Sequence, residues 1–168
     1  IMMKKIAVIN DLSGLGKCSL TAAIPVISVM GMQACPFPTA VLSNQTGYET
    51  YFCEDLTRQM TPYMEQWKKR GFIPDGIYTG FLSDEKQADK ILKFMDLFAG
   101  EETLILTDPV MGDDGEVYPI YTEGLRSRFR ELVSRSYVIT PNLTEALLLL
   151  YGKEEMEKKW KVLETMPE

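Results

Sequence analysis

A short apolar run that leads straight into an acid and a proline is the feature that most limits what this chain can fold into. The run is LIL at residues 104–106, and TDPVMG follows it at 107–112. Uninterrupted apolar runs of this length are typical of strands buried on both faces of a parallel sheet. Pro109 has no N–H and therefore ends the hydrogen-bond ladder. We expect Asp108 to lie at the carboxyl end of the strand, where open α/β sheets bind ligands.

A second junction of this kind occurs further along the chain. The run YVI at 137–139 is followed by TPNLTE at 140–145. Two strands that each end at a proline with an acid nearby suggest a site for a phosphorylated ligand and its metal ion. Taken singly, each segment also fits an ordinary turn at the end of a strand.

Strand and helix patterns alternate along the chain. Short apolar runs predict strands at 6–10, 36–42, 76–79, 103–107 and 138–139, and helical spacing predicts helices at 19–30, 56–70, 83–98, 122–133, 144–151 and 154–163. We expect Ser83 and Thr122 to cap their helices, and the prolines at 36 and 38 to place part of their strand at a sheet edge. The alternation predicts a doubly wound, mostly parallel α/β sheet with helices on both faces, in a single domain over residues 1–168.

Composition and charge exclude several classes of function. The net charge of −6 and the pI near 4.8 argue against nucleic acid as the main partner, because that role usually needs a basic surface. No apolar run approaches the ~20 residues of a membrane span. Cys18, Cys35 and Cys53 lie in no metal-ligand spacing and fit a reduced, cytoplasmic protein. The chain contains no histidine, which excludes Ser-His-Asp and Cys-His catalysis and leaves proton transfer to other side chains.

The segment DLSGLGK at 11–17 has the look of a phosphate loop but fails two tests. A P-loop needs glycine where Asp11 stands and serine or threonine where Cys18 stands, and a dinucleotide fingerprint needs a third glycine at Ser19. Two glycines after a strand also fit a tight turn.

Two further groups of residues are candidates for a binding site. The polar cluster SNQTGY at 43–48 lies between apolar segments and predicts either a solvated loop or a flap over a ligand. Tyr78, Gly80 and Phe81 lie at the end of the 76–79 strand, on the same sheet edge. An aromatic ring there either stacks on a flat heteroaromatic ligand or packs into the core.

Five segments of the chain carry a family resemblance. They are MKKIAVINDLSGLGKCSLTAA at 3–23, TAVLSNQTGYE at 39–49, YTGFLSD at 78–84, TDPVMG at 107–112 and ITPNLTEA at 139–146. Together they resemble the pyridoxal (vitamin B6) kinases, a branch of the ribokinase-like small-molecule kinases. The last two segments are the most specific for that family, and SNQTGY favours pyridoxal over other substrates. The resemblance implies a ribokinase-like fold and a cytoplasmic homodimer.

For the substrate, the resemblance implies a pocket formed by Asp11, Thr46, Tyr48, Gly80 and Phe81. Asp11 stands where family members have a small polar residue, often serine, in contact with the pyridine ring. Its carboxylate is a departure that allows pairing with a protonated ring nitrogen or with a ring hydroxyl, and it leaves the preferred vitamer open. The Thr46 hydroxyl would form a hydrogen bond with a polar group of pyridoxal, with Tyr48 packed nearby.

For the nucleotide, the resemblance implies ATP bound as its magnesium complex by Asp108, Thr140, Asn142 and Glu145. Mg²⁺ prefers oxygen ligands, commonly one or two carboxylates completed by water and phosphate, and we expect Asp108 and Glu145 to supply the carboxylates. Asn142 would hold a phosphate oxygen or a bound water. Glu145 also fits a helix N-terminal acid that the helix dipole stabilises.

Three functions are compatible with these residues. The first is ATP-dependent phosphorylation of the 5′-hydroxymethyl group of pyridoxal, pyridoxamine or pyridoxine in B6 salvage. The second is the hydroxymethylpyrimidine kinase of thiamine synthesis, which shares the fold and the DPVM segment. SNQTGY and the absence of a GGAG-like string weigh against this second function. The third is a non-catalytic binding or dimerisation fragment.

The third function is considered because the chain lacks the G-x-G-D motif by which ribokinase-like enzymes most resemble one another. The glycines of that motif hold the transferring phosphate at a helix N-terminus, and its Asp takes the proton from the substrate hydroxyl. We therefore expect residues 1–168 to be an N-terminal fragment of a kinase, with no catalytic residue of its own and with the catalytic Asp beyond Glu168.

Overall fold

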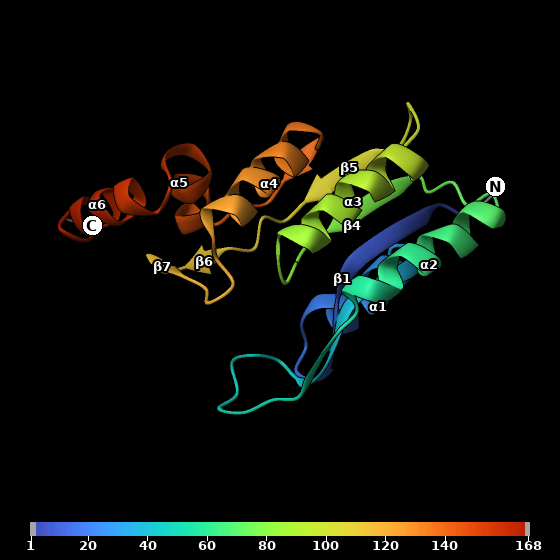
Figure 1. Ribbon diagram of the computed structural model, residues 1–168, viewed down its shortest axis with the longest axis horizontal. Coiled ribbons are helices and arrows are strands. Elements are labelled where there is room, and N and C mark those ends of the chain that lie inside the picture. The colour runs from blue at the N-terminus through green and yellow to red at the C-terminus, as the bar shows by residue number, and fades with distance from the viewer. Residues whose placement is uncertain (1–2, 167–168) are drawn as a thin grey trace.

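The computed structural model describes residues 3–166 and contains a six-stranded sheet with the strand order β3-β2-β1-β4-β5-β8 (Figure 1). Every neighbouring pair is parallel except β2 and β3, so the predicted mostly parallel sheet is confirmed. The strands are β1 (Lys5–Leu15), β2 (Gln33–Asn44), β3 (Cys53–Asp55), β4 (Gly76–Thr79), β5 (Leu104–Thr107) and β8 (Val138–Ile139).

Helices cover both faces of this sheet, as the alternation of strand and helix predicts. On β1, Ala7 and Ile9 pack into the larger core with the helices from α2 onward, whereas Val8 faces Leu20 and Ile27 of α1 on the other side. No helix within residues 3–166 has the length and apolar character needed to cross a membrane. The helices are α1 (Ser19–Val29), α2 (Thr57–Lys69), α3 (Glu85–Phe98), α4 (Glu123–Ser134), α5 (Leu143–Tyr151) and α6 (Lys153–Glu164).

The first strand is longer than the sequence predicts. β1 continues to Leu15, so most of the segment 11–17 is extended and pairs with β2 instead of forming a tight turn. The register shifts between Asn10 and Leu12, which marks a local irregularity. The acid and glycines of this segment concealed the strand, because such residues are depleted in most strands.

The second strand carries the two prolines, and part of it lies at an edge as predicted. β3, which the sequence did not predict, pairs with residues 40–42 of β2 and leaves the stretch with Pro36 and Pro38 without a strand on its outer side. The carbonyl of Pro36 accepts a hydrogen bond from the Tyr63 hydroxyl at 2.9 Å. Tyr63 of α2 thus occupies one backbone carbonyl on the edge that no strand covers.

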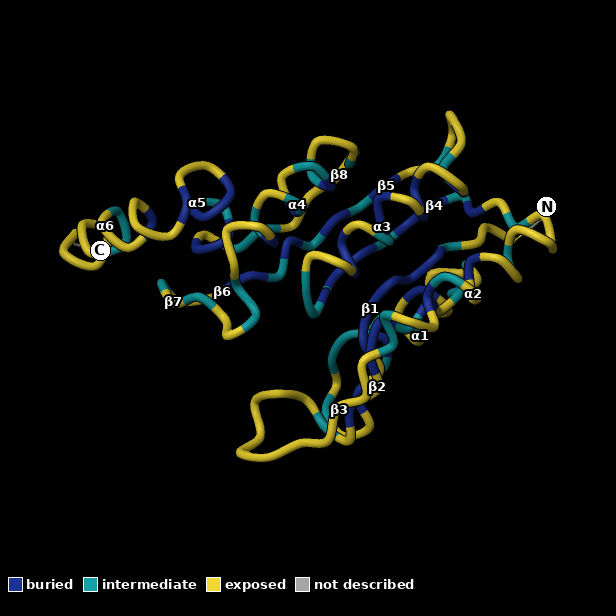
Figure 2. Tube along the Cα trace, viewed as in Figure 1, coloured by how far each residue is buried: buried dark blue, intermediate teal, exposed yellow. Residues whose placement is uncertain are grey.

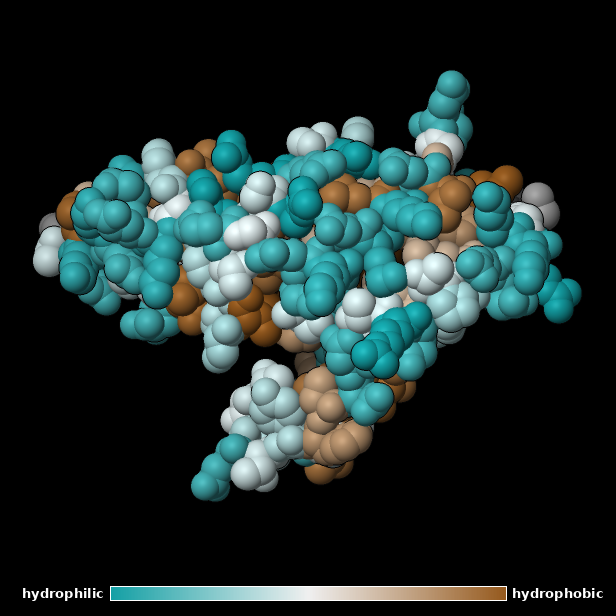
Figure 3. Space-filling view, viewed as in Figure 1, coloured by the Kyte–Doolittle hydropathy of each residue, from teal (hydrophilic) through white to brown (hydrophobic). Residues whose placement is uncertain are grey.

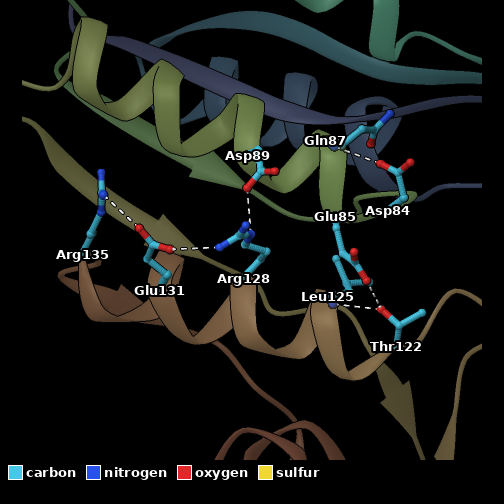
Figure 4. Close-up of polar contacts among 9 residues, drawn as sticks. All are labelled: Asp84, Glu85, Gln87, Asp89, Thr122, Leu125, Arg128, Glu131 and Arg135. Atoms are coloured by element: carbon cyan, nitrogen blue, oxygen red, sulfur yellow. Dashed lines mark hydrogen bonds and ion pairs between the residues drawn. The ribbon is translucent and has the colours of Figure 1, made fainter.

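The predicted cap of α4 is confirmed, and the predicted cap of α3 is wrong by one residue. Thr122 caps α4 by accepting a hydrogen bond from the N–H of Leu125 at 2.9 Å (Figure 4). Helix α3 is capped by Asp84, whose carboxylate accepts from the N–H of Gln87 at 2.9 Å. The N–H of Ser83 donates to the Gln87 side chain instead. A carboxylate at the N-cap also interacts favourably with the helix dipole, which serine does not.

A short hairpin follows β5 and was also not predicted. It consists of β6 (Gly112–Asp113) and β7 (Glu116–Val117). Asp114 and Gly115 form its turn, with φ values of 48° and 78°, as a two-residue hairpin turn requires. A Cβ atom on Gly115 would clash with Nε1 of Trp160, so helix α6 packs directly against the turn.

A fully buried glutamine joins the elements at the β2 side of the sheet. The amide nitrogen of Gln87 donates to the Thr39 carbonyl at 2.9 Å and lies 3.1 Å from side-chain oxygens of Asp55 and Thr57. Its oxygen accepts from the N–H of Ser83 at 2.9 Å. Both ends of this amide have partners, so its burial carries no unpaired polar group.

Replacing Gln87 with leucine should destabilise the fold, because a side chain of similar size would leave these buried backbone and side-chain groups without partners. We expect a loss of about 1–3 kcal/mol in the free energy of unfolding, measured by urea denaturation. Gln66→Leu makes the same change at an exposed position of α2 and is the control. Equal stability of the two variants would contradict a structural role for Gln87.

Candidate active site

A cleft of about 620 Å³ lies at the carboxyl ends of the parallel strands. Its walls come from the end of β1, the loop after β2, the ends of β4 and β5, and the segment after β7. We call residues 45–52, between β2 and β3, the flap; Figure 2 shows it as an exposed loop that projects from the sheet. Figure 3 shows a hollow between this projecting part and the rest of the molecule. Open α/β sheets bind ligands at this edge.

The second half of β1 contributes Asn10, Asp11 and Ser13 to the cleft, and each of these residues is buried. Oδ1 of Asn10 accepts hydrogen bonds from the backbone N–H groups of Asp11 at 3.1 Å and of Phe81 at 3.0 Å. Oδ2 of Asp11 accepts from the Ser13 hydroxyl at 2.9 Å. A single side-chain amide therefore ties the end of β1 to the segment that follows β4.

Gly80 supports this arrangement from outside the cleft. A Cβ atom on Gly80 would lie 2.5 Å from Nδ2 of Asn10, which is closer than real side chains come. Of the two residues predicted to bind substrate at this strand end, Phe81 lines the cleft, and Gly80 makes room for Asn10 instead. Tyr78 of β4 lines the cleft as well; burial and the charge of Asp108 raise the pKa of its hydroxyl.

The base of the flap is closed by hydrogen bonds from β2. The Ser43 N–H donates to the Phe52 carbonyl at 3.0 Å, and Nδ2 of Asn44 donates to the Thr50 carbonyl at 2.9 Å. Thr46 lines the cleft as predicted.

Tyr48, the other residue predicted on the flap, is 49% exposed and is not part of the cleft wall, where Tyr51 takes its place. The sequence offered both tyrosines in one polar loop. Tyr51 is also 49% exposed, and nothing in the spacing of the two tyrosines distinguishes the one that lines the cleft.

Asp108 lies at the end of β5 and lines the cleft, as the strand-acid-proline pattern predicts. Its backbone N–H donates to the Thr79 carbonyl at 2.8 Å, which continues the β4–β5 pairing by one more residue. Burial raises the pKa of the Asp108 carboxyl, and a hydrogen bond with Thr140 opposes this rise. Thr140 itself is exposed and does not form part of the cleft wall.

Glu145 and Asn142 lie behind the cleft wall and brace it. Asn142 caps α5, and the two side chains form a capping box, with Oδ1 of Asn142 accepting from the Glu145 N–H at 2.9 Å and Oε2 of Glu145 accepting from the Asn142 N–H at 3.0 Å. The other carboxylate oxygen accepts from the Met111 N–H at 3.2 Å, and Nδ2 of Asn142 donates to the Gly112 carbonyl at 2.8 Å. The start of α5 is thereby fastened to the segment that carries Asp108.

Asp108 and Glu145 are the two carboxylates predicted to hold a magnesium ion, and residues 3–166 contain no group of three or more acidic, cysteine or histidine side chains arranged to hold a metal. Burial raises the pKa of Glu145, and the charge of Asp108 raises it further, so the two carboxylates are within electrostatic range. A divalent cation would offset the unfavourable burial of both charges. Mg²⁺ needs one or two protein carboxylates, and each Glu145 oxygen keeps a second lone pair beside its backbone bond.

The remaining wall, formed by Tyr118, Pro119 and Ile120, was missed in the sequence. These residues follow β7, and the Tyr118 N–H donates to the Met111 carbonyl at 2.9 Å, which fixes where the segment enters the cleft. Burial, with negative charges that include Asp108, raises the pKa of the Tyr118 hydroxyl. The segment carries no motif, and its position depends on the hairpin that precedes it.

Comparison with known proteins identifies the family of this site. Residues 16–167 match the model of the phosphomethylpyrimidine kinase family. The chain belongs to the phosphomethylpyrimidine and pyridoxal kinases, which are ribokinase-like. The resemblance found in the sequence and the predicted ribokinase-like fold are thus confirmed.

Individual relatives agree with this assignment. The chain is 30% identical over 140 residues to a pyridoxine/pyridoxal/pyridoxamine kinase of Bordetella avium, covering 80% of this chain and 47% of the relative. A crystal structure with pyridoxal of a protein from Bacteroides thetaiotaomicron, provisionally named a phosphomethylpyrimidine kinase, matches at 41% identity with a TM-score of 0.87, over 96% of this chain and 59% of the other.

A more distant relative shares the fold. The pyridoxal kinase of Leishmania donovani, solved with ADP and pyridoxamine, matches at 23% identity and a TM-score of 0.77, over 98% of this chain and 60% of the other. The chain thus spans about half to three fifths of the lengths of the three relatives.

The contact between Gly80 and Asn10 can be tested by adding one methyl group. Gly80→Ala should push the Asn10 amide away from the N–H groups that it accepts from, and we expect a loss of about 1–3 kcal/mol in the free energy of unfolding. The control is Gly100→Ala, because a Cβ atom there would meet its nearest neighbour at 3.9 Å. Urea denaturation measures the free energy of unfolding of both variants. A Gly80→Ala protein as stable as the control would show that the Asn10 amide has room to move.

Proposed function

We propose that the whole protein transfers the γ-phosphoryl group of ATP to the 5′-hydroxymethyl group of a B6 vitamer (pyridoxal, pyridoxamine or pyridoxine) in B6 salvage. The observation that carries the proposal is a single cleft with an aromatic and polar wall around Asp11 and Phe81 and a carboxylate, Asp108, at the neighbouring strand end. A family member that is 41% identical was crystallised with pyridoxal. Because the chain spans only part of its relatives, the activity is proposed for the full-length protein.

The wall around Phe81 suits a flat heteroaromatic ring. Phe81, Tyr78 and Tyr51 offer aromatic surface, and Leu42 adds an aliphatic contact. Aromatic rings stack in offset or edge-to-face arrangements that a pyridine ring satisfies. Asp11 and Thr46 would then form hydrogen bonds with the polar substituents of the ring. These hydrogen bonds would fix the orientation of the ring, which aliphatic contacts alone cannot do.

The strand ends around Asp108 suit the nucleotide and its metal. We propose that Asp108 and Glu145 hold Mg²⁺, directly or through water, and that Thr140 and Asn142 contribute to the nucleotide end of the site. When bound, the ion neutralises charge that develops on the transferred phosphoryl group. The protein residues position the phosphate and exclude water around it. The Leishmania relative was solved with ADP, which supports a nucleotide in this family.

Hydroxymethylpyrimidine kinase activity is the second candidate, and it is favoured by the match of residues 16–167 to the phosphomethylpyrimidine kinase family. Pyrimidine and pyridine substrates are both flat rings with a hydroxymethyl group, so the aromatic wall alone does not separate them. A comparison of kcat/KM values separates the two substrates. We expect the full-length protein to phosphorylate pyridoxal with a kcat/KM at least about tenfold above that of the hydroxymethylpyrimidine. The reverse order, measured with both substrates under one ATP concentration, would assign the protein to thiamine synthesis.

The role of Asp108 is tested by removing its charge. In the full-length protein, Asp108→Asn should lower kcat/KM for MgATP on the order of 100-fold, about 2.7 kcal/mol of transition-state stabilisation, and raised Mg²⁺ should restore part of the loss. The dissociation constant of pyridoxal should change less than about twofold, because Asp108 is proposed to act on the metal. Glu116→Gln removes a charge at an exposed position of β7 and is the control. Loss of pyridoxal binding with unchanged use of MgATP would refute the assignment.

A further inference from the structure

The part of the cleft that the chain provides is negatively charged. Its lining includes two carboxylates, Asp11 and Asp108, and no lysine or arginine among residues 3–166. If Asp108 serves a metal ion, the charge of Asp11 remains without a counterion. A buried carboxylate that lacks an opposite charge is costly, so such a charge is expected to meet a cation when the site is filled.

Asp11 is held in place by hydrogen bonds, and none of the ion pairs within residues 3–166 involves it. The residue is 6% exposed. Its Oδ2 atom accepts from the Ser13 hydroxyl at 2.9 Å, and its backbone N–H is bound by Asn10. No hydrogen bond within the described chain uses Oδ1, and the residue lines the cleft, so Oδ1 is free for a ligand.

The backbone around Asp11 is tightly packed, and the Ser13 hydroxyl orients the carboxylate. Ser13 is 1% exposed, and a Cβ atom on Gly14 would lie 2.7 Å from the Ser43 carbonyl of β2, so the end of β1 packs tightly against its neighbour. Asn10 fixes the Asp11 N–H from the other side. A carboxylate held in this way has already lost the freedom that binding would otherwise remove, which favours a strong interaction with one ligand group.

From this geometry we propose that Asp11, positioned by Ser13, determines substrate specificity by binding a positively charged N–H group. The proposal rests on the proposed B6 kinase function and adds the form of the substrate that the site selects. The group is either the ammonium of an aminomethyl substituent or a protonated ring nitrogen. The site therefore binds pyridoxamine, or the pyridinium form of any vitamer, more tightly than a neutral ring with neutral substituents.

The chemistry of the vitamers separates these two sources of charge. Pyridoxamine and pyridoxine differ in one substituent, aminomethyl against hydroxymethyl. An alkyl amine is protonated at neutral pH, since its pKa is about 10, as for lysine, whereas a hydroxymethyl group is neutral. Both groups can donate a hydrogen bond to the Asp11 carboxylate, but only the ammonium adds an opposite charge, and charge pairing is stronger in a buried site than in water. The ring nitrogen is common to all vitamers and gains its charge only as the pH falls.

The test compares the full-length protein with its Asp11→Asn variant, which keeps the shape of the side chain and removes the charge. Dissociation constants of pyridoxamine and pyridoxine are measured by calorimetry at neutral pH, and that of pyridoxine is followed as the pH is raised. In the parent we expect pyridoxamine to bind about tenfold more tightly than pyridoxine, or pyridoxine to bind about tenfold more weakly as its ring nitrogen loses its proton. The first result assigns the ammonium and the second the ring nitrogen.

In Asp11→Asn the difference in affinity seen in the parent, whether between pyridoxamine and pyridoxine or between protonated and deprotonated pyridoxine, should fall to about twofold or less. Ser13→Ala should reduce the preference without abolishing it, because the carboxylate stays but loses its fixed orientation. Glu54→Gln, an equal loss of charge at an exposed position of β3 outside the cleft, should leave the preference unchanged.

Each outcome bears on a different statement. If the parent binds all vitamers equally at every pH, or if Asp11→Asn keeps the parental preference, the inference about Asp11 is wrong while the proposed function stands. If the parent binds no vitamer at all, the proposed function and the inference fail together. Circular dichroism of each variant establishes that it is folded before its affinity is compared.

Discussion

The hydrogen bonds accepted by one buried side-chain oxygen, Oδ1 of Asn10, link the strands whose ends form the cleft. This atom accepts from the N–H of Asp11, at the irregularity within β1, and from the N–H of Phe81, beyond the last paired residues of β1 and β4. Leaving a buried donor unpaired costs about 1–3 kcal/mol. The link exists because residue 80 has no side chain, so a glycine outside the cleft sets the positions of Asp11 and Phe81 within it.

The capping box of α5 performs the same task at the other end of the cleft. Glu145 and Asn142 use all of their polar atoms on backbone groups of α5 and of the segment after Asp108. The arrangement has an electrostatic cost, because burial raises the pKa of both Asp108 and Glu145. Groups with raised pKa values favour the folded state most below their unfolded pKa and lose that contribution as the pH rises through the folded pKa. A cation bound near them would remove this cost at neutral pH.

The sequence predicted the features that depend on local chemistry. Apolar runs predicted the strands β4, β5 and β8, the proline after β5 predicted the place of Asp108, and the residue type predicted the Thr122 cap. Each of these signals acts on its own neighbours in the sequence. Thr46 and Phe81, which the family resemblance placed in the substrate pocket, line the cleft. The magnesium and nucleotide roles of Asp108, Thr140, Asn142 and Glu145 remain predictions.

The features that the sequence did not predict depend on partners far along the chain. Strand β3 exists because Cys53–Asp55 meets residues 40–42, and β1 reaches Leu15 because β2 runs beside it. The presence of Tyr51 in the cleft wall, where Tyr48 was predicted, depends on how the flap is anchored, and the wall at Tyr118 depends on the hairpin. Gly80 was predicted to touch the substrate, and its part in the site became visible only once Asn10 was seen against it.

The two prolines of β2 have a consequence for the behaviour of this protein in a crowded solution. Uncovered strand edges act as templates on which foreign chains add by hydrogen bonding, and this is a common route to aggregation. Beside Pro36 and Pro38 the edge offers fewer N–H groups, and the Tyr63 hydroxyl already occupies the Pro36 carbonyl. An incoming strand would therefore find few partners on this stretch, which protects the sheet without an additional strand to cover it.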